Sequence, residues 1–193
     1  QETYPGERRV ALVPAAVPAL TKAGLVVHVE SGAGAEAGFP DSEYEVQGAK
    51  MAPGRAELLS GADVLLYVRG LGANADVGAA DLESLRAGQS VIGLLDPLGA
   101  PEAARQLADA GVTAFALELI PRISRAQSMD VLSSMATVAG YKAVLLAAEA
   151  LPKIFPMMIT AAGTITPARV LVVGAGVAGL QAIATSRRLG GVV

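Results

Sequence analysis

The feature that constrains this chain most is a glycine pattern near its C-terminal end. An apolar run at residues 170–173 is followed by Gly174, Gly176 and Gly179, and then by a largely apolar segment up to Leu189. The run predicts a buried parallel strand, and the segment after the glycines predicts a helix. The first glycine permits a tight turn, the second lets a ligand approach the backbone, and the third lets the helix lie close to the sheet. This G-x-G-x-x-G spacing is typical of dinucleotide-binding folds.

The glycine spacing by itself is a weak signal, because tight turns without a ligand are common in a chain with 22 glycines. The strand before it and the helix after it favour a phosphate site at the helix N-terminus, beside Val177 and Ala178. The fingerprint also uses an acidic residue about 20 positions further on, which binds the ribose hydroxyls of NAD. That position falls after Val193, and the chain starts without Met, so we expect both ends to be cut.

Composition excludes several classes of function. The chain has 193 residues, 52% hydrophobic and 17% charged, which suits a well-buried globular protein of one domain and a piece of another. A net charge of −3 without a basic run argues against nucleic-acid binding. With no Cys and one His, disulfides, a thiol nucleophile and a metal site are not expected. We expect His28 to be a strand residue with a satisfied ring, and we expect no membrane-spanning helix.

Strands and helices alternate in the predicted structure of the N-terminal region. Strands are predicted at residues 10–13, 25–29, 64–68, 90–95 and 112–117. Helices are predicted from Pro14 to Gly24 and at residues 40–44 (capped by Asp41 or Ser42), 56–59, 80–87 and 101–110. Residues 32–38 are predicted to be a connecting loop. This order predicts an α/β fold with a doubly wound parallel sheet, whose strands are apolar because both faces are buried.

The C-terminal region is predicted to lead into a second domain. A helix is predicted at residues 126–150, ended by Pro152 and Pro156, and the uncharged residues 154–168 are predicted to form a packed connection. The predicted domains are an N-terminal α/β (flavodoxin-like) domain at residues 1–129, a linking helix and connection at 130–168, and the start of a Rossmann-type doubly wound domain at 169–193. One strand and one helix cannot bury a sheet, so this piece alone should bind nucleotide poorly.

A second candidate site is the polar run P-R-I-S-R-A-Q-S-M-D at residues 121–130. It follows a predicted strand, and ligands of open α/β sheets bind at the carboxyl ends of strands. Ser124 and Gln127 also fit a helix capping box, with Asp130 in the first turn. Spacing alone favours the helix cap, but capping does not explain Arg122 and Arg125, so a ligand site at this run stays open.

Longer runs then show a family resemblance. Residues 121–134, 139–143 and 173–180 resemble the NAD(H)-binding component of proton-translocating nicotinamide nucleotide transhydrogenase. Residues 7–14 and 34–39 match the wider family shared with alanine dehydrogenase. The resemblance covers essentially the whole chain, and its specific portion is R-I-S-R-A-Q-S-M-D, because the glycine fingerprint matches many dehydrogenases.

The resemblance implies a cofactor and the residues that hold it. Arg122, Gln127 and Asp130 would form a catalytic loop that holds the nicotinamide end of NAD(H), with Ser133 beside it. The remaining implied contacts are Arg125, Ser128 and Met129 in the loop, and Gly174, Gly176, Val177, Ala178 and Gly179 at the glycine turn. An amide can orient the carboxamide, and an arginine can bind phosphate or carboxylate oxygens.

The resemblance also implies partners. Hydride would pass between NAD(H) and NADP(H) on a partner component, and membrane-spanning subunits would move protons. The chain would form a homodimer on the cytoplasmic side of the membrane, attached through these subunits and without inserting itself.

Two other functions stay open. An alanine dehydrogenase needs cationic anchors and a general acid or base. The Lys and His that serve in that family align with Arg69 and Asp96 here, whereas its carboxylate-binding arginine is retained as Arg9. Asp96 does not replace a near-neutral imidazole unless its pKa is greatly raised. The third possibility is a non-catalytic module that senses NAD(H).

Overall fold

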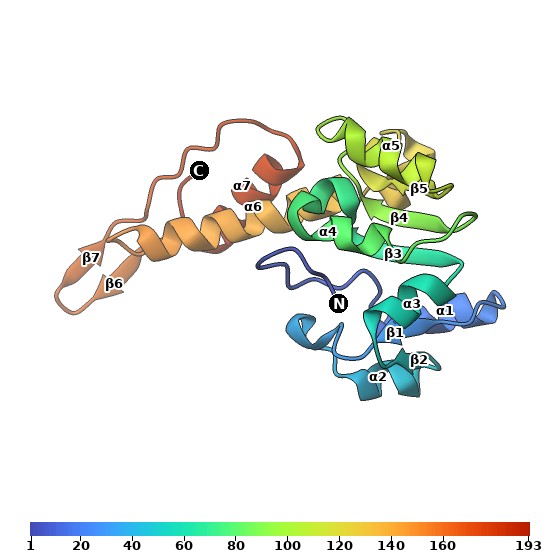
Figure 1. The fold of residues 1–193 in the computed structure, drawn as a ribbon. Helices are drawn as coiled ribbons and strands as arrows, with labels where there is room; N and C mark the ends of the chain where they lie inside the picture. Colours follow the sequence, from blue (N-terminus) through green and yellow to red (C-terminus); the bar gives the residue numbers. More distant parts are fainter. The chain divides into compact units, whose positions relative to one another are not determined.

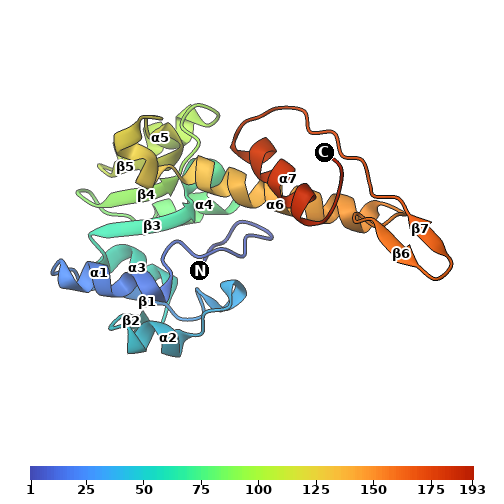
Figure 2. The ribbon, with the colours of Figure 1, turned by 180° about the vertical axis from the view of Figure 1, so that it is seen from behind.

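The computed structural model describes residues 1–193, which divide into two compact units, Gln1–Pro121 (unit 1) and Arg122–Val193 (unit 2). Unit 1 contains two parallel sheets and the helices that connect their strands (Figures 1 and 2). One sheet pairs β1 (His28–Glu30) with β2 (Lys50–Ala52), and the other has the order β3 (Val64–Arg69), β4 (Ser90–Leu94), β5 (Thr113–Ala116). The predicted α/β class with parallel strands is therefore confirmed.

The helices of unit 1 lie between these strands. The α-helices are α1 (Val17–Lys22), α2 (Asp41–Val46), α3 (Arg55–Gly61), α4 (Ala75–Leu82) and α5 (Pro101–Asp109). Single 3-10 turns are η1 (Pro14–Ala16), η2 (Ala35–Ala37), η3 (Leu71–Asn74) and η4 (Leu117–Leu119). The predicted strands at 64–68, 90–95 and 112–117 and the helices at 56–59 and 101–110 are confirmed to within a few residues.

Three predictions for unit 1 are wrong. No strand forms at residues 10–13, where the chain bends before Pro14, which has no N–H for a ladder. Asp41 is not a helix cap, because its carboxylate binds Ser31 Oγ (2.5 Å) and the backbone N–H of Gly32 (2.8 Å). The helix expected at 80–87 begins earlier, at Ala75. β2 was not predicted, since three residues with one apolar pair give no readable alternation.

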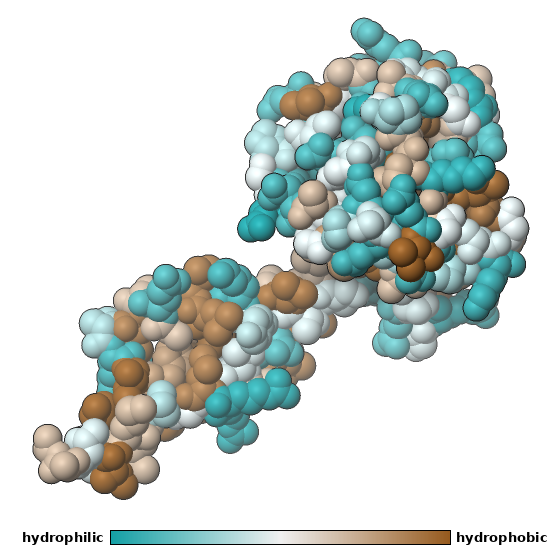
Figure 3. All heavy atoms as spheres, turned by 90° about the horizontal axis from the view of Figure 1, so that it is seen from below, coloured by the Kyte–Doolittle hydropathy of each residue, from teal (hydrophilic) through white to brown (hydrophobic).

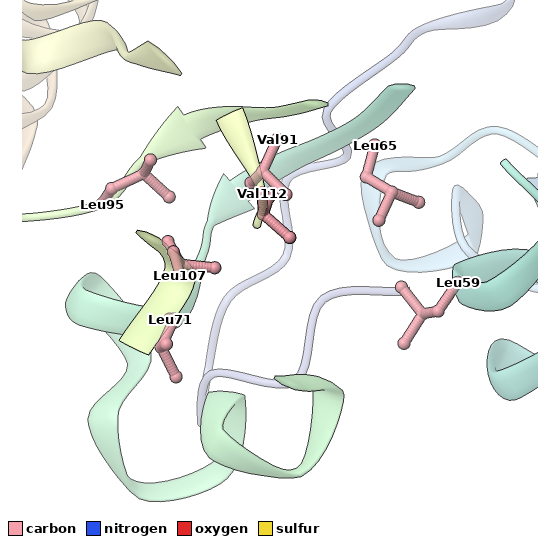
Figure 4. Close-up of a cluster of buried hydrophobic side chains, with 7 residues drawn as sticks. All are labelled: Leu59, Leu65, Leu71, Val91, Leu95, Leu107 and Val112. Atoms are coloured by element: carbon pink, nitrogen blue, oxygen red, sulfur yellow. The ribbon is translucent and has the colours of Figure 1, made fainter. Parts of the chain in front are cut away.

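The main core of unit 1 lies between the β3-β4-β5 sheet and the helices around it. Figure 4 shows its seven buried side chains, contributed by strands, helices and the segments that join them: Leu59, Leu65, Leu71, Val91, Leu95, Leu107 and Val112. Gln89 is fully buried beside this core, and its amide donates to the carbonyls of Leu59 (2.7 Å) and Ala62 (2.6 Å). A second, smaller core centres on Val17 and Tyr44.

Unit 2 is built on two helices that pack against each other. After the 3-10 segment η5 (Ser124–Met129), α6 (Val131–Ala150) runs to the hairpin of β6 (Met158–Thr160) and β7 (Gly163–Ile165), and α7 (Val177–Arg188) lies against α6 in both ribbon views (Figures 1 and 2). Their shared core is Val144, Phe155 and Ala168. The helix predicted from residue 126 thus begins at Val131, because residues 124–129 form the tighter 3-10 turns.

Two predictions for unit 2 are wrong. Residues 154–168 are packed only at their two ends, where Phe155 and Ala168 are buried; between these ends they form an antiparallel hairpin in which every strand residue is exposed. Residues 170–173 form no regular strand: only Arg169 pairs, with Val192, and Leu171 and Val173 are 88% and 92% exposed. A strand forms only where a neighbouring strand pairs with it residue by residue, and here Val192 is the only residue that pairs with this segment. Figure 3 shows hydrophobic side chains, in brown, on the surface of this unit at the lower left.

α6 also has the length and apolar composition of a membrane-spanning helix, with a mean hydropathy of 1.5 over 18 residues. Such a helix was not expected from the sequence. A single helix of this length and composition is weak evidence for a membrane span. α6 carries Lys142 in its middle and packs against α7 at Gly140.

Candidate functional site

The polar loop of unit 2, residues 122–130, is fixed to the start of α6 by Asp130. The Asp130 carboxylate accepts hydrogen bonds from the backbone N–H of Ser133 (2.9 Å) and from its hydroxyl (2.7 Å), and the Ser134 hydroxyl donates to the Asp130 carbonyl (3.0 Å). Asp130 is therefore the N-cap of α6. The predicted capping box is wrong, because Ser124 forms no cap and η5 begins without a side-chain hydrogen bond.

The same contacts keep Asp130 ionised. The backbone N–H of Ser133 and then its hydroxyl lower the pKa of the Asp130 carboxyl below its usual value, and the nearby positive charge of Arg122 adds to this. At neutral pH Asp130 is thus a hydrogen-bond acceptor only, with its oxygens already engaged by Ser133.

The other loop residues present free polar groups. The exposed side chains are those of Arg122, Arg125, Gln127, Ser128 and Met129, whereas Ala126 is buried and anchors the loop. Ser124 is exposed as well, so the loop offers two guanidinium groups, an amide and two hydroxyls on a backbone that η5 and the α6 cap hold in place. A guanidinium group can bind two anionic oxygens through two parallel hydrogen bonds, and a side-chain amide can donate one hydrogen bond while it accepts another.

The glycine turn of unit 2 is built for close approach. Gly174 has φ +101°, a conformation that side chains disfavour, and a Cβ at Gly179 would lie 2.0 Å from the Gly174 carbonyl oxygen. α7 begins at Val177 with Gly176 as N-cap and with no side chain bound to its first amides. The N–H groups of a first helical turn have no partner inside the helix, so they are open to an anion.

The arginines that alanine dehydrogenase would use lie in unit 1 and are already paired. Arg9 binds the Glu7 carboxylate through Nε (2.7 Å) and Nη2 (2.6 Å), and Arg69 Nε lies 3.2 Å from the same carboxylate. These contacts, Arg9 first, lower the pKa of Glu7 from 4.5 to about 2 against the opposing effect of burial. A substrate carboxylate at these arginines would have to displace Glu7.

Asp96 forms no hydrogen bond with Glu7, Arg9 or Arg69. Its backbone has φ 47°, and its carboxylate accepts the N–H of Gly99 (3.2 Å). Glu118 accepts the N–H groups of Leu95 (2.8 Å) and Asp96 and so holds this turn. His28 is a strand residue, as predicted, and its side chain is exposed.

Two residues with evident roles in the structure were not singled out from the sequence. Glu7 forms ion pairs with both Arg9 and Arg69, and no spacing rule predicts a partner as far along the chain as Arg69. Gly140 is the only glycine inside α6 and is buried against α7. An isolated glycine within a helical pattern is a signal of close packing, so this one could have been found.

The chain matches two family models in succession. Residues 1–139 match the model described as "Alanine dehydrogenase/PNT, N-terminal domain", and residues 143–193 match "Alanine dehydrogenase/PNT, C-terminal domain". Among curated proteins, it is 47% identical over its whole length to a protein of Rhodospirillum rubrum that is named as a part of NAD(P) transhydrogenase subunit alpha, and it covers 50% of that protein. It is 32% identical over 95% of its length to an alanine dehydrogenase of Halomonas elongata, of which it covers 48%.

Solved structures give the same result. A transhydrogenase from Sinorhizobium meliloti superimposes with a TM-score of 0.92 at 50% identity, over 99% of this chain and 53% of that one. An L-alanine dehydrogenase superimposes with a TM-score of 0.82 at 26% identity, over 99% of this chain and 51% of that one. The chain spans about half the length of these relatives. With both family models matched along nearly all of its residues, the chain belongs to the alanine dehydrogenase/PNT family.

Proposed function

We propose that this chain belongs to the NAD(H)-binding component of a nicotinamide nucleotide transhydrogenase, which exchanges hydride between NAD(H) and NADP(H). The observation that carries the proposal is the polar loop Arg122–Asp130, fixed by its own cap to α6 in the same unit as the glycine turn. The similarity to relatives named as transhydrogenase subunits extends through this loop.

The residues of unit 2 fit a dinucleotide. The diphosphate suits the first turn of α7, where Gly174 and Gly176 leave the backbone bare and no side chain occupies the amides. Val177, Ala178 and Gly179 supply these amides. The nicotinamide end suits the polar loop, whose exposed amide and guanidinium groups match a carboxamide and anionic oxygens.

In this proposal the chain acts mainly by positioning. The bound nicotinamide supplies the chemistry of hydride transfer between ring carbons. Gln127 holds the carboxamide, and Arg122 and Arg125 bind anionic oxygens of the nucleotide. Asp130 keeps the loop in place through Ser133, and Ser128 and Met129 flank the ring. No protein group has to donate or accept a proton at the reacting carbons, so rate depends on holding two rings about 3 to 3.5 Å apart in a dry pocket.

The proposal includes partners. NADP(H) would be held by a second component, and membrane-spanning subunits would couple the reaction to proton movement, with this chain on the cytoplasmic side. A homodimer is also proposed. Its support is the β6–β7 hairpin, which exposes Met157, Met158 and Ile159, because a lone two-stranded hairpin is only marginally stable in water. Sedimentation of the full-length protein as a monomer would contradict the dimer.

The function can be tested with the full-length protein, its NADP(H)-binding partner and NADH deuterated at the transferring position. We expect deuterium to appear in NADPH. Gln127→Asn shortens the amide arm by one methylene, and a displacement of about 1 Å can slow transfer about 100-fold while NADH affinity changes much less. The same change at the exposed Gln47 is the matched control and should leave both values unchanged. Absence of deuterium transfer in the wild type would contradict the function.

An alanine dehydrogenase is the second candidate, favoured by the superposition with the L-alanine enzyme and by the presence of Arg9. The pairing of Arg9 and Arg69 with Glu7 and the absence of an imidazole at Asp96 weigh against it. Oxidation of NADH that depends on pyruvate and ammonia would establish this candidate in place of the first. Tight NADH binding with neither reaction would instead indicate a sensing module.

A further inference from the structure

The single glycine inside α6 lies against backbone. A Cβ placed on Gly140 would be 2.2 Å from the carbonyl oxygen of Ala178 and 2.9 Å from its carbonyl carbon. Glycine in the middle of a helix is less favourable than alanine, so local helix preference does not account for it. The position takes glycine because the backbones of α6 and α7 touch there.

The contact lies at one end of a packed face. Gly140, Val144 and Ala148 are spaced four apart, which places them on one side of α6. Val144 is 5% exposed and packs in one core with Ala148 and with Ala182 of α7. Ala182 in turn lies one helical turn after Ala178. The two helices therefore pack along this row, and at Gly140 the backbone of α6 lies directly against that of α7.

On α7, the contact falls on the turn that we assign to the diphosphate. Ala178 belongs to the first turn, and its neighbour Gly179 is equally confined, since a Cβ there would lie 2.0 Å from the Gly174 carbonyl oxygen. The first turn of α7 is thus held from two sides by contacts that leave no room for a methyl group.

α6 itself begins at the end of the polar loop. Asp130 caps it through Ser133, and Gly140 follows ten residues later, which is about 15 Å along the helix at 1.5 Å per residue. The helix between these points is continuous, so it joins the loop to the glycine turn as a rigid spacer.

We propose that Gly140 is a positioning residue. By letting α6 touch the first turn of α7, it sets the distance between the polar loop, which we assign to the nicotinamide, and the glycine turn, which we assign to the diphosphate. This inference rests on the proposed function and deepens it. In this inference α6 is a spacer whose length between the polar loop and Gly140 matches the length of the bound dinucleotide.

Gly140→Ala in the full-length protein is the direct test. Ordinary contact begins at 3.4 Å, so the new methyl must move the Ala178 carbonyl by about 1 Å, a displacement that can cost about 100-fold in rate. We expect hydride transfer to fall by about this factor and kcat to fall more than KM for NADH rises. We also expect Tm to fall, although helix preference alone predicts a rise.

Two control variants separate positioning from stability. Val144→Ala removes packing in the same helix pair without inserting an atom, so it should lower Tm yet keep kcat near the wild-type value. Gly61→Ala places a methyl at the end of α3, where nothing lies within 4 Å, and should change neither. A Gly140→Ala protein with wild-type kcat, or one that loses no more kcat than Val144→Ala, would overturn the inference.

A second variant covers the case in which Gly140→Ala does not fold. One alanine inserted between Ser134 and Met135 leaves the Gly140 contact intact but moves the loop by about 1.5 Å and 100° relative to it. We expect NADH binding with hydride transfer lost, and a wild-type rate would overturn the inference. Failure of the proposed function is distinguishable, because it would show as absent hydride transfer in the wild-type protein itself.

Discussion

Similar apolar segments are buried in unit 1 and exposed in unit 2. In unit 1, β4 lies between β3 and β5, and its residue Val91 is 2% exposed. In unit 2, the equally apolar residues 170–173 have one paired neighbour, and Val173 is 92% exposed. The difference teaches that an apolar pattern reports a tendency to be buried, and that burial itself depends on neighbouring strands.

The two units also differ in how their helices are held. The helices of unit 1 pack around a sheet over a core of seven side chains, whereas α6 and α7 pack mainly on each other around Val144, Phe155 and Ala168. The candidate site lies wholly in the less covered unit. Its geometry therefore depends on a few contacts, chiefly the Asp130 cap and the Gly140–Ala178 approach.

The largest expected effect comes from the core of unit 1. Leu107 is 3% exposed, and Leu107→Ala should lower the free energy of unfolding by about 3 to 5 kcal/mol, through lost burial and the cavity left behind. Leu171→Ala, at 88% exposure, should change it by less than about 0.5 kcal/mol in this 193-residue chain. Urea unfolding of both variants measures the contrast. Equal losses would show that residues 170–173 are buried after all.

A buried polar group gives the next effect. Gln89 is fully buried, donates to two carbonyls and accepts the N–H of Arg86 at 2.7 Å. Gln89→Leu removes the partner of the Leu59 carbonyl and of the Arg86 N–H, and leaves the Ala62 carbonyl with only the longer contact to Arg86 Nη2 (3.4 Å), so it should cost about 2 to 3 kcal/mol. In unit 2, Gln181 binds only the Thr185 hydroxyl at 3.1 Å, so Gln181→Leu should cost less than about 1 kcal/mol. Chemical unfolding checks both, and a neutral Gln89→Leu would contradict the burial.

Much of unit 1 could be predicted from its sequence because its strands find their neighbours within it. Local signals such as Pro101 at a helix start and Gly24 after a helix end agree with the structure. The failures have local causes. The run before Pro14 reads as a strand but has no neighbour to pair with, and β2 is too short to show a period.

The site was predictable in its residue types and less so in its contacts. The glycine turn followed from spacing, and Gly174 and Gly179 have the geometry that the spacing requires. Spacing alone favours Ser124 as the cap, because that is how a capping box is defined, whereas the structure begins α6 later and caps it with Asp130. The roles of Arg122 and Gln127 stay predictions that need kinetic tests.

Acid should weaken unit 1 through Glu7. Its folded pKa of about 2 lies below the ordinary 4.5, so its pairing stabilises the fold fully above pH 4.5 and is lost as pH falls toward 2. We expect a loss of about 2 kcal/mol, less than the whole shift implies, because Arg9 is 36% exposed and water screens the pair. Glu7→Gln should remove this component of the pH dependence. Unchanged acid unfolding in that variant would contradict the assignment.

The smallest effect distinguishes the observed N-cap of α6, Asp130, from the cap predicted from the sequence, Ser124. Asp130→Ala removes the acceptor for the Ser133 N–H, so the start of α6 should fray and Tm should fall slightly, whereas Ser124→Ala should leave Tm unchanged. Asp130→Asn keeps an acceptor and should lie between them. Because the folded pKa of Asp130 is lowered, the difference between wild type and Asp130→Asn should shrink as pH falls below the ordinary carboxyl value. Thermal unfolding at two pH values measures this. If Ser124→Ala were the destabilising change, the helix would begin at the capping box that the sequence suggests, and the loop would be part of α6.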